Sequence, residues 1–97
     1  MAQEREQELQ RRRADLQRRQ KEEQDRLDRF LREVDSWEKS RRIRRYARVV
    51  ERFLLVKHGG IQAGSEAAEW LSWARRLADR FDPLVPTPPS VLDERVE

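Results

Sequence analysis

The stretch RRIRRYARVVERFLLV, residues 41–56, has the periodicity of a helix with two chemically different faces. Its apolar residues recur every three or four positions, which gathers them on one side of an α-helix. They are Ile43, Tyr46, Ala47, Val50, Phe53 and Leu54. Arginines recur in the same way on the other side. We therefore expect one face to pack in a core and the other to meet water or an anion.

The arginine face is the strongest functional signal in the chain. Residues 34–58 carry a net charge of +5, whereas the whole chain carries +3. A guanidinium group matches the geometry of phosphate and carboxylate, so this face could follow a nucleic-acid backbone or an acidic protein surface. A face that only meets water is the third interpretation. The candidates for anion or nucleic-acid binding are Arg41, Arg44, Arg45, Arg48 and Arg52.

The N-terminal third predicts one long charged helix. Residues 2–34 contain no Gly or Pro and are rich in Glu, Gln, Arg and Leu, which favour helices. Acid-to-base pairs four positions apart, such as Glu8–Arg12 and Asp15–Arg19, add support on its surface.

A coiled-coil pattern is present but irregular. One heptad position holds Leu9, Leu16, Glu23, Phe30 and Trp37, and its companion holds Arg13, Gln20, Leu27 and Val34. A regular two-stranded coiled coil needs both positions apolar over several heptads, and here they are polar before Leu27. We interpret the first 25 residues as a charged rod and residues 27–37 as a docking surface. The interface candidates are Leu27, Phe30, Leu31, Val34 and Trp37.

The apolar face shifts to nearly the opposite side of the helix after Trp37. Either the helix breaks at Asp35 or Ser36, where Asp35 and Glu38 have the spacing of a capping box, or one continuous helix serves two partners. We favour the break. The expected domains are a charged helical rod over 1–34, a helical hairpin over 35–84 and an extended tail over 85–97.

The hairpin has clear start and stop signals. We expect Gly60 to end its first helix as the C′ residue, with Ile61 against Val56. Ser65 can cap the next helix, and Pro83 ends it. Two helices joined by a short loop form an antiparallel αα-hairpin.

The fold class is therefore all-α: a long charged helix, an αα-hairpin and a proline-rich C-terminal strap that begins with PLVPTPP at residue 83. In the hairpin, one set of side chains should pack on the other. These sets are Trp70, Leu71, Leu77 and Phe81 on the second helix, and Ile43, Tyr46, Val50, Phe53 and Leu54 on the first.

The sequence offers no catalytic constellation. It has no cysteine, one histidine (His58) beside a helix end, no isolated pair of carboxylates and no glycine-rich phosphate loop. We expect no enzyme activity, metal site, cofactor or small-molecule substrate. No apolar run is long enough to span a membrane, and the N-terminal residues lack the apolar segment of a secretory signal, so we expect a cytoplasmic protein.

Spaced residues between Trp37 and Leu84 form the pattern W…IRRY…WLSWA…ADRFDPL. This pattern resembles the C-terminal region of a group of uncharacterised bacterial proteins that are often encoded near mobile elements. The likeness covers residues 5–85 and implies that the chain corresponds to part of a longer protein. The group has no settled activity, so the resemblance implies no catalytic residue here.

These observations predict a non-enzymatic helical module for protein–protein interaction or oligomerisation. The partner would be another protein or a second copy, in a DNA-associated bacterial protein. The alternative is direct, weakly sequence-specific nucleic-acid binding through the arginine face.

Overall fold

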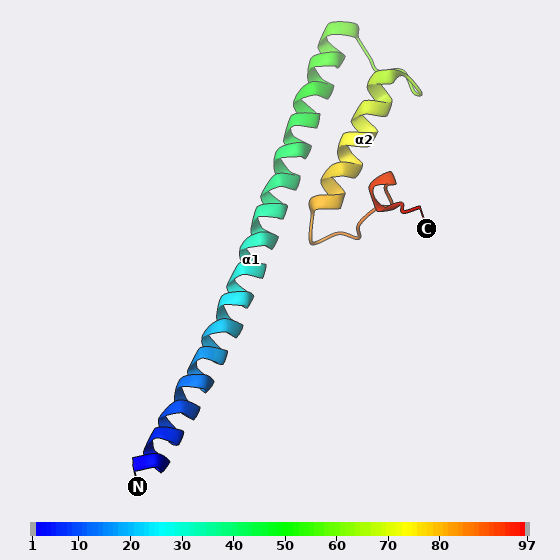
Figure 1. The fold of residues 1–97 in the computed structure, drawn as a ribbon. Helices are drawn as coiled ribbons and strands as arrows, with labels where there is room; N and C mark the ends of the chain where they lie inside the picture. Colours follow the sequence, from blue (N-terminus) through cyan, green and yellow to red (C-terminus); the bar gives the residue numbers. More distant parts are fainter. Residues whose placement is uncertain (1, 97) are drawn as a thin grey trace. The chain divides into compact units, whose positions relative to one another are not determined.

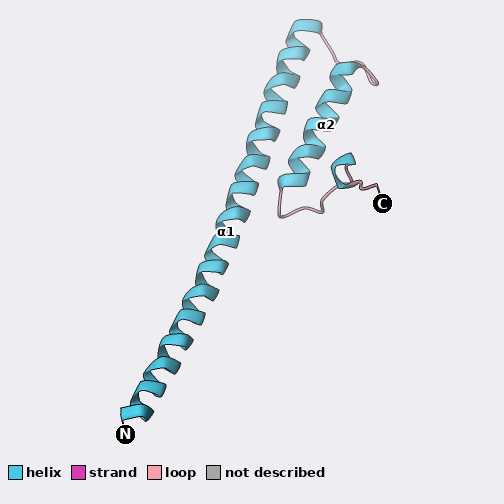
Figure 2. Cartoon of the chain, viewed as in Figure 1, coloured by secondary structure: helices cyan, strands magenta, loops and turns pink. Residues whose placement is uncertain are grey.

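The computed structural model describes residues 2–96, and helices dominate them (Figures 1 and 2). Helix α1 spans Ala2–His58, α2 spans Glu66–Phe81, and a short 3-10 helix, η1, spans Val91–Asp93. No strand occurs among the described residues. The predicted all-α class is confirmed. Residues 1–32 and 33–97 form two compact units, which are described separately.

Helix α1 runs without interruption from Ala2 to His58, so the break that we favoured at Asp35 or Ser36 is wrong. A capping box forms only where the chain leaves helical geometry, and no Gly or Pro forces it to do so here. A continued helix keeps every backbone hydrogen bond across this point, whereas a cap replaces only one or two of them. The apolar residues over 27–37 and the arginines from Arg41 onward therefore belong to one helix.

The end of α1 lies one residue earlier than the glycine pattern predicted. Gly59, not Gly60, has the left-handed backbone conformation, with φ of 76°. Its N–H donates to the carbonyl of Leu55 at 2.9 Å, which is the single bond of a simple left-handed helix end rather than a Schellman end. Val56, the expected partner of Ile61, is exposed.

Helix α2 lies beside the C-terminal part of α1 and runs antiparallel to it (Figure 1). Its core is the cluster of Ala47, Leu71 and Ala74, with Ile61 and Trp70 packed at the edge. The two alanines let the helix backbones come close. The predicted hairpin is confirmed.

Local signals position α2. Ser65 accepts a hydrogen bond from the N–H of Ala68 at 3.2 Å and caps the helix as expected. The helix ends at Phe81, and Asp82 is its C-cap residue. Pro83 follows, so the predicted stop is confirmed.

The core uses only one edge of the apolar face predicted for α1. Phe53 and Tyr46 were expected in the core, yet 60% and 63% of their surfaces are exposed. Tyr46 still meets Trp70 edge-on, with ring centroids 6.1 Å apart. Helix α2 is centred on Ala47, where close approach is easiest, so the far edge of the apolar face stays open.

The tail is extended over residues 86–90 and then turns into η1, so the expected fully extended tail needs correction at 91–93. Ser90 caps η1 by accepting a hydrogen bond from the N–H of Leu92 at 3.2 Å. Arg80 of α2 donates two hydrogen bonds to the carboxylate of Asp93, at 2.9 and 2.6 Å. This bidentate pair ties the tail to α2.

The core predicts a sharp contrast between two leucines. Leu71 is 2% exposed, whereas Leu84 is 80% exposed. Leu71→Ala should therefore lower the free energy of unfolding by about 2–5 kcal/mol, because it removes buried methyl groups and leaves a cavity. Leu84→Ala, the matched control, should change it by less than about 0.5 kcal/mol. Urea denaturation followed by circular dichroism measures both, and equal effects would contradict this core assignment.

Candidate functional site

The N-terminal unit is a charged helix with isolated apolar side chains on its surface. Two of the predicted ion pairs are present: Arg12 binds Glu8 at 2.7 Å, and Arg19 binds Asp15 at 3.1 Å. Further along the helix the order of the pairs differs, because Lys21 binds the later residue Asp25 at 3.3 Å. A hydrogen bond from Arg18 also lowers the pKa of Asp15. These pairs are exposed, so each contributes little to the stability of the helix.

The five interface candidates differ in exposure. Leu27, Phe30 and Leu31 are exposed, and 60% of the Phe30 surface is accessible. Val34 and Trp37 are half-buried. The three exposed side chains could each still bury apolar surface in a complex.

Trp37 is followed one turn later by the first residue of the arginine face. The Arg41 guanidinium lies 4.8 Å from the centre of the Trp37 ring, a cation–π contact. Trp37 of the interface candidates and Arg41 of the arginine face therefore meet on the surface of α1.

Four arginines of α1 surround one shallow depression of about 340 Å³. The lining residues are Glu38, Arg41, Arg42, Arg45 and Arg48. The structure thus brings together three of the predicted anion-binding candidates. It adds Arg42, which periodicity did not single out because its position on the helix lies away from the others. Arg52 is exposed but does not line the depression.

Arg44 does not belong to this group, which corrects its place among the anion-binding candidates. Its guanidinium donates to Asp79 Oδ1 at 2.8 Å and to Asp82 Oδ2 at 2.7 Å. Both carboxylates belong to the end of α2, so Arg44 joins the two helices. These two hydrogen bonds, Asp79 first, raise the pKa of Arg44. Acidic residues three apart at the end of an antiparallel helix were the sequence signal for this pairing.

Asp82 is the centre of this ionic contact. It is buried, and its Oδ1 accepts a hydrogen bond from the N–H of Leu84 at 2.9 Å. That bond and the one from Arg44 lower the pKa of Asp82. Both oxygens of the carboxylate are satisfied, so it anchors the end of α2 and is not a free catalytic base.

A second ionic contact lies along the same helix pair. Arg75 of α2 binds Glu51 of α1. Together with the Arg44 contacts it flanks Ala47 on α1, but as an exposed pair it contributes little to the packing by itself.

An apolar groove remains between α1 and α2 on the other edge. It has a volume of about 360 Å³. Its lining residues are Arg42, Ile43, Tyr46, Trp70, Trp73, Ala74 and Leu77. Sequence periodicity assigned Tyr46 and Leu77 to the core, whereas the structure places them beside a groove open to solvent.

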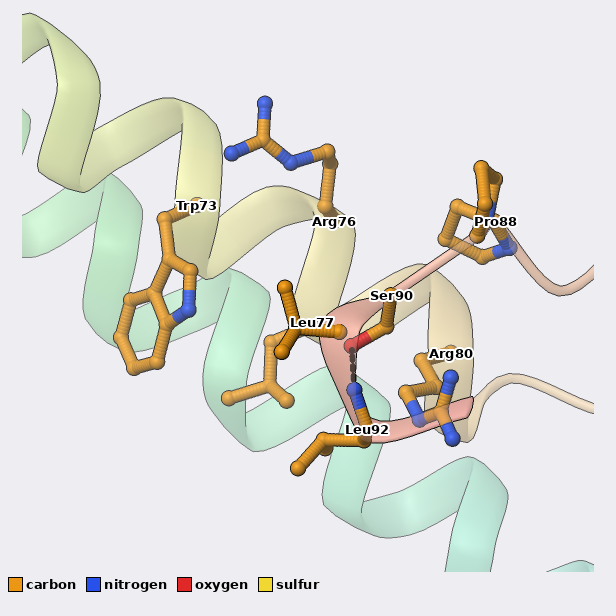
Figure 3. Close-up of a pocket in the computed structure, with 9 residues that line it drawn as sticks. Trp73, Arg76, Leu77, Arg80, Pro88, Ser90 and Leu92 are labelled. Atoms are coloured by element: carbon orange, nitrogen blue, oxygen red, sulfur yellow. Dashed lines mark hydrogen bonds between the residues drawn. The ribbon is translucent and has the colours of Figure 1, made fainter. Parts of the chain in front are cut away.

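A further hollow of about 560 Å³ lies between α2 and the tail. Figure 3 shows the segment with Ser90 and Leu92 beside Leu77 of α2. Arg76 and Arg80 also line it, and Arg80 is held by Asp93. The lining contains no carboxylate and no histidine, so it offers no acid–base pair for catalysis.

Within residues 2–96, no three His, Cys, Asp or Glu residues are grouped so that they could hold a metal ion. No helix in the described part of the chain combines the length and apolar character needed to cross a membrane.

Comparisons with protein-family models, curated proteins and solved structures find no match to this chain. The resemblance to uncharacterised bacterial proteins therefore stays a prediction, and the proposals below depend on geometry and charge.

The Arg44–Asp82 contact predicts how the hairpin responds to acid. The pKa of Asp82 is lower in the folded chain than its ordinary value of 3.8, so ionised Asp82 stabilises the fold at any pH above that value. This stabilisation is lost as the pH falls through the lowered pKa. The urea midpoint should thus fall between about pH 6 and about pH 3. Arg44→Ala should have a lower midpoint at pH 6 and a smaller fall, because one cause of the lowered pKa is removed.

The matched control is Arg45→Ala. It removes the same charge at the next residue, whose side chain is exposed. It should keep both the wild-type midpoint and its pH dependence. Indistinguishable pH profiles for wild type and Arg44→Ala would show that this contact does not hold the hairpin.

Proposed function

We propose that this chain is a non-enzymatic helical assembly module that binds another polypeptide through one side of α1. That side, the assembly face, consists of Leu27, Phe30, Leu31, Val34 and Trp37. The exposure of Phe30 carries the proposal, since an aromatic side chain on a charged helix contributes little while it faces water.

The energetics favour a helical partner for this face. About half of the surface of Leu27, Phe30 and Leu31 is still accessible, so burial of each would contribute roughly half of the ~1.5–3 kcal/mol that a fully exposed side chain gains. The surrounding residues are charged and keep the free helix in solution. A narrow apolar stripe with charged flanks is the surface that pairs helix against helix.

The setting is also part of the proposal. We place the chain in a cytoplasmic bacterial protein that is encoded near mobile elements, and the sequence resemblance supports this setting. The net charge of +5 over residues 34–58 supports an association with DNA. No small-molecule substrate or cofactor enters this function.

The proposal predicts concentration-dependent association. Sedimentation equilibrium from about 1 µM to about 1 mM covers free energies of association of about −8 to −4 kcal/mol. The wild-type chain should pass from monomer to a defined oligomer in this range. Phe30→Lys should stay monomeric, because it places a charge in the assembly face.

Val56→Lys is the matched control, since Val56 lies on the same helix and is exposed. It should associate as the wild type does. A wild-type chain that stays monomeric throughout, with circular dichroism showing α1 fully helical, would contradict the proposal.

Nucleic-acid binding is the second candidate function, and the arginine depression favours it. Arg41, Arg42, Arg45 and Arg48 converge there with only one acid, Glu38. Among residues 2–96 none of these four arginines is held in an ion pair, unlike Arg44. Their spacing along α1 suits successive phosphates of a backbone rather than the edges of bases.

This candidate predicts mainly electrostatic binding. If the four arginines each neutralise one phosphate, log affinity against log salt should have a slope of roughly −3 to −4 on duplex DNA. Arg48→Ala should flatten the slope by about one unit and weaken all sequences alike. Arg5→Ala, an equal charge change on the N-terminal unit, should leave the slope nearly unchanged. Fluorescence anisotropy that shows no binding at low salt would exclude this candidate.

A further inference from the structure

We propose that the partner of the assembly face is a second copy of this chain, with the two α1 helices antiparallel. Phe30 of one copy then faces Val34 of the other, and Leu27 faces Trp37. This inference rests on the proposed assembly function and names its partner. It adds an orientation and a register, which charge and heptad position decide.

The continuity of α1 makes the heptad count unbroken from residue 9 to residue 55. One position of the heptad, position d, holds Leu9, Leu16, Glu23, Phe30 and Trp37. The companion position a holds Arg13, Gln20, Leu27, Val34, Arg41, Arg48 and Leu55. Two of the exposed arginines thus occupy the same heptad position as the apolar residues of the assembly face.

Antiparallel coiled helices pair position a of one chain with position d of the other. With Phe30 against Val34, the adjacent layer pairs Leu27 with Trp37. A twofold axis repeats each layer, so the centre contains four apolar layers in succession. In no other part of the heptad pattern are consecutive a and d positions all apolar.

The charged layers outside the centre fit the same register. One layer further out, Arg41 faces Glu23 of the other copy, which pairs opposite charges. The next layer places Arg44 opposite Gln20, and in the layer after that the aliphatic stem of Arg48 lies against Leu16 and leaves the guanidinium in water. Two layers beyond Arg48, Leu55 pairs with Leu9, and both are exposed.

Charge excludes the other simple arrangements. In a parallel pair each residue meets its own copy, so Arg41 would face Arg41 and Glu23 would face Glu23. An antiparallel pair moved by one heptad sets Glu23 against Val34 in one direction, or Arg41 against Phe30 in the other. Only the proposed register keeps apolar residues together and opposite charges together.

Contacts with α2 occupy the position d residues of α1 beyond Trp37, so these residues are not free to pair with the second copy. Arg44 and Glu51 continue this position beyond Trp37, but they bind Asp82 and Arg75 of α2. The outer layers therefore depend on position a of one copy and position d of the other copy's N-terminal unit. We expect the four central layers to contribute most of the affinity and the Glu23–Arg41 layers to set the orientation.

Cysteine pairing tests the orientation, because the chain has no cysteine of its own. Leu27→Cys and Trp37→Cys are mixed as full chains in a glutathione redox buffer. The mixed dimer should dominate over either self-linked dimer, since Leu27 of the two copies would lie about 15 Å apart along the helix axis. Dominant self-linking of both variants would overturn the antiparallel arrangement.

A charge exchange tests the register without touching the apolar centre. Glu23→Arg alone and Arg41→Glu alone should each weaken the dimer by roughly tenfold, because each brings like charges together in two symmetric layers. The double variant inverts both layers and should return to near wild-type affinity. In a parallel pair the double variant keeps like charges together, so absence of rescue would overturn the inference.

Sedimentation of the same wild-type chain separates this inference from the function on which it rests. Association with self-linked cysteines, or without rescue, overturns the antiparallel register and leaves the assembly function standing. A monomeric wild type at all concentrations overturns the assembly function and this inference with it.

Discussion

The uninterrupted backbone hydrogen bonding of α1 is the constraint on which the other features depend. Backbone hydrogen bonds continue in helical geometry from Ala2 to His58, so the direction of each side chain on α1 follows from its place in the sequence. Within residues 33–97, Trp37 and Tyr46 therefore lie on different sides of α1. Within this unit the helix packs in the hairpin core on one side and leaves the arginine depression on another.

The hairpin shows how a small core is positioned by size and charge together. Ala47 permits close contact with Leu71 and Ala74, and the ionic contacts of Arg44 and Glu51 lie on either side of it along α1. Two of α1's charged residues become structural in this way. The same contacts leave Tyr46 and Trp73 beside an open groove, so the hairpin covers less of α1 than its apolar face would allow.

Much of this fold is predictable from local signals. The charged helix, the cap at Ser65, the stop before Pro83 and the antiparallel hairpin all follow from helix propensity, capping and loop length. The continuity of α1 at Asp35 was missed because a capping pattern states where a helix can begin, not where one must end. The sequence also could not predict how much of the apolar face α2 covers. That coverage depends on which residue of α1 allows α2 to approach most closely, here Ala47.

The arginines show where periodicity stops being informative about function. Arg44 and Arg48 lie one turn apart, yet Arg44 is held by two carboxylates of α2 and Arg48 lines an open depression. Periodicity groups residues by direction along one helix, whereas the partner of a charge depends on the end of another helix. Only the position of Asp79 and Asp82 separates a structural arginine from one that is free to bind.

The two proposed functions share residues and would compete. In the antiparallel pair Arg41 and Arg48 lie in the seam between the helices, so fewer arginines would remain for phosphates. Arg45, at position e, stays at the rim of the seam, and Arg42, at position b, points away from it. Each function would therefore weaken the other by a coupling that must be equal in both directions. A nucleic acid that draws Arg41 from Glu23 would loosen the dimer, and assembly would in turn reduce the charge that the arginine depression offers to a nucleic acid.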